Sequence, residues 1–183
     1  EFLLKFAKDK QRWMYWLFEA KKDSGSAFEF YRHFKSYVHL LVYDTGNGNE
    51  AIPKSIQLIA GKTGQEFNNR KGRNGAFWQD RYHATAVATD DHLIRCMVYI
   101  DLNMVRAGVV KHPRDWPFGG YRYIVAPPQR YQLTDNKKLM ELTNISEIDR
   151  FCETYRNWVD ATIVRQLPIQ FCAKCAKYFA PSL

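Results

Sequence analysis

Two residues in the segment VYIDLNMVRAGVV have side chains and a spacing that suit phosphodiester chemistry. Tyr99 and Asn103 are four residues apart, so on a helix they project from one face as neighbours. A tyrosine hydroxyl can attack a phosphodiester and hold a covalent phosphotyrosine link. An amide oxygen one turn later can ligate a hard divalent cation beside the same phosphate. The alternative is a half-buried tyrosine that only packs against the core.

Histidine is the other candidate ligand. His39 lies in the apolar run YVHLLVY, and His33 and His83 are further imidazoles that could approach it. A lone histidine on a buried strand is also explained as a hydrogen-bonded core residue. No two of these histidines have ligand spacing on one element, so the sequence does not indicate a zinc site.

A basic and aromatic tract follows in the chain. Arginines, lysines and aromatic rings interleave over RKGRNGAFWQDRYH, as in proteins that bind phosphates and stack on the bases of single strands. The candidate nucleic-acid contacts are Arg70, Lys71, Arg73, Trp78 and Arg81. A polar loop that leads into a core strand is the alternative interpretation.

The composition favours a nucleic-acid partner. The 183 residues carry a formal net charge of +8, which suits a polyanion. A soluble basic protein with a solvated lysine face is the alternative interpretation of the charge. No apolar run approaches the ~20 residues that span a bilayer, and the N-terminus lacks a signal-peptide core, so we expect a cytoplasmic protein without membrane contact. Cys172 and Cys175 form a single CxxC, which is a weak metal signal without a second pair, and a zinc-ribbon-like regulator is a distant alternative.

The apolar periodicity predicts the elements that must position these residues. Helices are expected at 1–22, 53–69, about 91–107, 133–142 and 146–163, and strands at 37–43 and 77–87. Helices that alternate with strands predict an α+β fold with a mostly antiparallel sheet.

Three segments together resemble a known family: HLLV (39–42), IPKSIQLIAGKTGQEFNNRKGRNGAFWQDRYHATAV (52–87) and HLIRCMVYIDLNMVRAGVV (92–110). They are similar to the REP-associated tyrosine transposases, relatives of the single-tyrosine HUH insertion-sequence transposases. The resemblance implies an antiparallel sheet flanked by helices, and cleavage and rejoining of single-stranded or hairpin DNA through a 5′-phosphotyrosine link. It implies Tyr99 as nucleophile, with His39 and Asn103 as ligands of Mg²⁺ or Mn²⁺.

The chain departs from the family pattern at three places. The expected motif Asn-His-apolar-His reads Ser36-Tyr37-Val38-His39, so a phenol replaces the first histidine. Residues 23–37 do not form the expected apolar strand, and two compensating frameshifts are one hypothesis for this. The family also has a strand before the first helix, so the sheet is expected to lack its first strand.

These observations predict a transposase-like domain over 1–125 and a C-terminal helical extension of uncertain role over 126–183. The departure at Tyr37 predicts impaired catalysis. A catalytically inactive DNA-binding module and a decaying remnant of a transposase are the alternatives.

Overall fold

The computed structural model describes residues 4, 6–24, 38–43, 50–78, 81–87 and 91–165. Seven α-helices and one short 3₁₀-helix form this part of the chain. They are α1 (Ala7–Ser24), α2 (Ala51–Lys71), α3 (Asp91–Asp101), α4 (Asn103–Arg106), η1 (Pro113–Asp115), α5 (Tyr121–Val125), α6 (Asn136–Leu142) and α7 (Ile148–Arg165).

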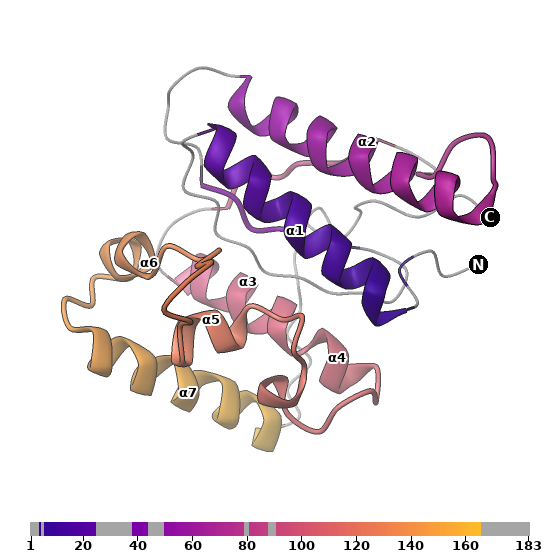
Figure 1. The fold of residues 1–183 in the computed structure, drawn as a ribbon. Helices are drawn as coiled ribbons and strands as arrows, with labels where there is room; N and C mark the ends of the chain where they lie inside the picture. The colour runs from indigo at the N-terminus through magenta and orange to yellow at the C-terminus, as the bar shows by residue number, and fades with distance from the viewer. Residues whose placement is uncertain are drawn as a thin grey trace.

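The helices form two layers, each with its own apolar cluster. Helices α1 and α2 lie side by side in one layer, and α3 to α7 form the other (Figure 1). The buried residues of the first cluster are Trp13, Leu17, Ala20, Val38, Ile59 and Leu133. Those of the second are Leu41, Leu93, Met97, Val98, Ile100, Leu102, Tyr121, Ile124, Leu139, Phe151, Tyr155 and Val159.

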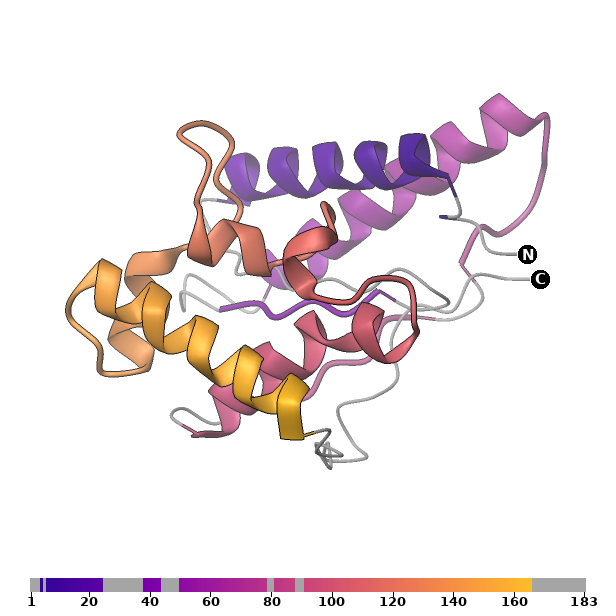
Figure 2. The ribbon, with the colours of Figure 1, turned by 90° about the horizontal axis from the view of Figure 1, so that it is seen from below.

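The predicted antiparallel sheet is wrong for the part of the chain that the structure describes. Neither 38–43 nor 81–87 forms a strand. Among the described residues of the predicted strand 77–87, Trp78 alone forms an isolated β-bridge. Burial explains why 38–43 needs no sheet on either face: the two helical layers cover the segment, which runs between them (Figure 2). Most of 81–87 is exposed instead, so this segment has little apolar surface to bury in a sheet.

The segment 38–43 nevertheless keeps the two-residue alternation of an extended chain. Val38, Leu40 and Val42 pack against the α1–α2 cluster. Leu41 belongs to the other cluster, and the His39 ring contacts Tyr99 of α3. The apolar sequence therefore correctly indicates burial on both faces, whereas the hydrogen-bonded partner strands that it led us to expect are not observed among the described residues.

The helical predictions are largely confirmed. Helix α2 extends two residues beyond the predicted end, to Lys71, and Gly72 closes it in the left-handed conformation at φ 59°. The predicted helix at 91–107 is interrupted at Leu102, which separates α3 from α4, and Gly108 follows α4 with φ 68°.

One buried carboxylate ties three helices of the second layer together. Asp101, at the end of α3, accepts a hydrogen bond from the Tyr121 backbone N–H of α5 at 3.1 Å. Its other oxygen accepts from the Tyr155 hydroxyl of α7 at 2.6 Å. The second apolar cluster contains residues from both sides of position 125, where the sequence predicted the transposase-like domain to end and the C-terminal extension to begin.

Candidate functional site

The structure brings together His39 and Tyr99, which are 60 positions apart in the chain. Their ring centroids are 6.2 Å apart, and the ring planes meet edge to face at 84°. His39 is buried at 8% exposure and Tyr99 is half-buried. The contact follows from the alternation of 38–43, because that pattern turns residue 39 towards α3.

Burial fixes the charge state of His39. Desolvation lowers the pKa of His39 from 6.5 to about 4, because the imidazolium form loses its hydration in the core. The imidazole is therefore neutral at neutral pH. A neutral imidazole can offer a nitrogen lone pair to a cation, but with this pKa it is a weak general base.

Asn103 and Arg106 continue the face of Tyr99 onto α4. The Asn103 Nδ2 atom is buried and has no hydrogen-bond partner. The Arg106 guanidinium lies 4.9 Å from the centroid of the Tyr99 ring, and its Nη1 donates to the Tyr99 carbonyl at 3.1 Å. Burial lowers the pKa of Arg106, and the interaction with the nearby Tyr99 acts in the opposite direction. We call His39, Tyr99, Asn103 and Arg106 the tyrosine cluster.

Arg106 received no role from the sequence, although its position carried a signal. It follows Tyr99 by seven residues, or two helical turns, which places both on one face. A cation at that position could have been paired with the developing charge of a phosphate. The interruption at Leu102 leaves this shared face intact, as the contact between Arg106 and Tyr99 shows.

His39 and Asn103, which the resemblance implies as metal ligands, both belong to the tyrosine cluster. The neutral His39 fits a divalent cation, and so does the Asn103 carboxamide if a 180° rotation puts its oxygen at the buried unpartnered position. No group of three or more His, Cys, Asp or Glu side chains that could hold a metal occurs within the described ranges. Tyr37, His33 and the CxxC pair at Cys172 and Cys175 fall outside those ranges.

The predicted phosphate contacts of the turn after α2 differ in their surroundings. Arg70 forms an ion pair with Asp9 of α1, a carboxylate that is 4% exposed. Lys71 is exposed, and its ammonium lies 5.7 Å from the Phe6 ring. Arg73 is half-buried and donates to the Ala76 carbonyl at 3.3 Å. Lys71 is consequently the more accessible cation, whereas Arg70 holds α2 against α1.

Trp78 is packed between α1 and α2. Its Nε1 donates to the Ala60 carbonyl at 3.0 Å, and its ring meets Trp13 edge to face at 5.4 Å. The neighbouring Phe77 is 4% exposed. These contacts support a packing role for Trp78, while Arg81 is exposed on 81–87, where a phosphate could reach it.

Comparisons with protein-family models, curated proteins and solved structures gave no match. In the described part of the chain, no helix combines the length and apolar character needed to cross a membrane.

Proposed function

We propose that this chain binds single-stranded DNA next to a hairpin and that Tyr99 is a nucleophile towards its phosphodiester backbone. The observation that carries the proposal is the contact of His39 with Tyr99, beside the Arg106 cation. The proposal rests on this local geometry and on the sequence resemblance, and it does not require a sheet.

The proposed step is a transesterification. The Tyr99 Oη attacks the phosphorus, the bond from phosphorus to the 3′-oxygen breaks, and a 5′-phosphotyrosine link and a free 3′-hydroxyl form. The phenolic proton leaves to solvent, because a histidine with a pKa of about 4 cannot hold it at neutral pH, and the departing 3′-oxygen takes a proton from solvent. Arg106, whose guanidinium lies beside the Tyr99 ring, would neutralise charge on the phosphate.

His39 and Asn103 are the residues that would hold a divalent cation. When bound, Mg²⁺ or Mn²⁺ would supply Lewis-acid polarisation of a phosphoryl oxygen. Burial keeps His39 in the neutral form that such a ligand requires, so its part in the proposal is to position and to coordinate.

An inactive DNA-binding module is the second candidate. Its supporting observation is that Tyr99 also packs against the apolar cluster of α3, α5, α6 and α7. In that case Tyr99 serves the core, and DNA binding depends on exposed cations such as Lys71 and Arg81.

A covalent-adduct assay separates the two candidates. The chain is incubated with Mn²⁺ and with labelled single strands that carry a hairpin, and the products are separated on a denaturing gel. We expect a labelled protein band in the wild type and its loss in Tyr99→Phe. Tyr123→Phe, at a half-buried tyrosine in α5, is the matched control and should keep the band.

The outcomes are distinct. Loss of the adduct in Tyr99→Phe alone supports the nucleophile. DNA binding without any adduct from wild-type protein contradicts catalysis and favours the binding module. An adduct that persists in Tyr99→Phe would place the reactive group elsewhere.

A further inference from the structure

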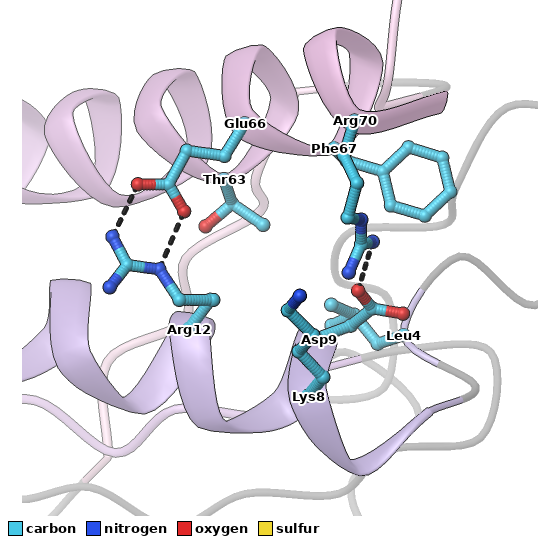
Figure 3. A pocket seen from close by; sticks show the side chains of 8 residues that line it. All are labelled: Leu4, Lys8, Asp9, Arg12, Thr63, Glu66, Phe67 and Arg70. Carbon is cyan, nitrogen blue, oxygen red and sulfur yellow. Dashed lines mark hydrogen bonds and ion pairs between the residues drawn. The ribbon is translucent and has the colours of Figure 1, made fainter. Parts of the chain in front are cut away.

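A cavity of about 140 Å³ lies between α1 and α2, away from the tyrosine cluster. Figure 3 shows its lining: Leu4, Lys8, Asp9, Arg12, Thr63, Glu66, Phe67 and Arg70. Two ion pairs bridge the helices across it, Arg12 with Glu66 and Arg70 with Asp9. Because Lys8 is exposed and also lines the cavity, the cavity reaches the protein surface.

Two buried oxygens of this lining lack hydrogen-bond partners. Asp9 is 4% exposed, and one of its oxygens is bound by Arg70 while Oδ2 has no partner. Thr63, also 4% exposed, has an unpartnered Oγ1. Buried polar atoms almost always have partners, so each of these oxygens indicates a group that completes it. A carboxylate oxygen can only accept, so that group must be a hydrogen-bond donor.

Charge and size narrow the class of ligand. Three cations and two carboxylates line the cavity, so a cationic ligand would meet an excess of positive charge. A neutral molecule that bears an N–H donor fits better. A cavity of roughly 150 Å³ holds one six-membered ring, which selects a single-ring heterocycle. The wall formed by Leu4 and Phe67 suits the apolar faces of such a ring.

The surroundings of the cavity suit a nucleic-acid strand. Lys8 and Lys71 are exposed near it and can meet phosphates, and Phe6, 56% exposed, lies beside the Lys71 ammonium. A strand that crosses this surface would bring one unpaired base to the opening.

We propose that the α1–α2 cavity receives one unpaired cytosine of a single-stranded DNA. The Asp9 Oδ2 accepts a hydrogen bond from the exocyclic amino group, as carboxylates do with cytosine N4, and Thr63 Oγ1 donates to the ring edge. Uracil and thymine present an oxygen where cytosine has the amino group, so the carboxylate repels them. This inference rests on the proposed binding of single-stranded DNA, but not on catalysis by Tyr99.

Binding of short labelled homopolymers, measured by fluorescence anisotropy, tests the proposal. We expect the full chain to bind oligodeoxycytidine about tenfold more tightly than oligodeoxyuridine, the effect of one hydrogen bond to a charged acceptor. Oligomers of N4,N4-dimethyldeoxycytidine lack the donor and should lose this preference. The comparison changes only the base, so the protein fold is the same in every measurement.

Asp9→Asn supplies the protein side of the test. It should abolish the preference for deoxycytidine, whereas Asp149→Asn, which removes the same charge from an exposed position on α7, should keep it. Thermal melting checks that Asp9→Asn is folded, and if it is not, the comparison of bases decides alone.

Each outcome bears on a stated claim. Equal affinity for the two homopolymers, with binding intact, overturns the cytosine cavity and does not affect the proposed function. Absence of any single-strand binding overturns both. A preference that survives Asp9→Asn overturns the assignment of the acceptor.

Discussion

Acidification should destabilise this fold through His39, and the sign follows from its burial. The pKa of His39 is about 4 in the folded chain and about 6.5 when the chain unfolds. Between these values the unfolded state binds more protons than the folded state, so the free energy of unfolding falls as the pH falls. The loss begins near pH 6.5 and continues to about pH 4, below which the contribution is constant.

The magnitude follows from the difference between the two pKa values. The difference between a pKa of about 4 in the folded chain and about 6.5 in the unfolded chain corresponds to about 3 kcal/mol in the free energy of unfolding. Such a loss is a large fraction of the stability of a small protein. Urea denaturation of the wild type and of His39→Leu at several pH values between neutral and about 4 measures it.

The difference between the two proteins isolates this histidine from the other titrating groups. We expect His39→Leu to lose about 3 kcal/mol less than the wild type over this range. His83→Leu, at an exposed histidine, is the matched control for replacing an imidazole by an apolar side chain. Parallel pH dependences for the wild type and His39→Leu would refute the buried neutral imidazole, and with it the metal-ligating form of His39.

Three further variants have expected results in stability and binding measurements. Tyr155→Phe removes the hydroxyl that donates to the buried Asp101 carboxylate, so urea denaturation should show a loss of about 2 kcal/mol. An unchanged midpoint would contradict a buried link between α3 and α7. Arg70→Ala should cost about 3 kcal/mol because it strands the buried Asp9 carboxylate. Lys71→Ala should change stability by less than about 0.5 kcal/mol, yet it should weaken single-strand binding in a salt-dependent way. Equal stability losses in Arg70→Ala and Lys71→Ala would contradict the structural role of Arg70.

The helices were predictable because their apolar periodicity and their caps are local. The stop at Gly72 depends on a left-handed residue, which is a preference of glycine itself. The sheet was not predictable in the same way. An apolar run such as 38–43 shows that both faces are buried, but helices can bury it as well as neighbouring strands can.

The candidate site was predictable only in part. Tyr99 and Asn103 are one turn apart, so their proximity follows from helix geometry. The approach of His39 is a tertiary contact that the family resemblance implied and the structure shows. The sequence could not show whether Arg70 and Trp78 are available to bind DNA. In the folded chain Arg70 forms an ion pair with Asp9, and the Trp78 indole donates a hydrogen bond to the Ala60 carbonyl.

The register of 38–43 connects the fold to the tyrosine cluster. Val38 and Leu40 face the α1–α2 layer, and the two-residue period then requires residue 39 to face α3. A slip of one residue would turn His39 into the α1–α2 cluster and leave Tyr99 without its neighbour. The apolar side chains at 38 and 40 therefore position the imidazole at 39, so cavity-forming substitutions at Val38 or Leu40 are expected to affect the contact with Tyr99 as well as stability.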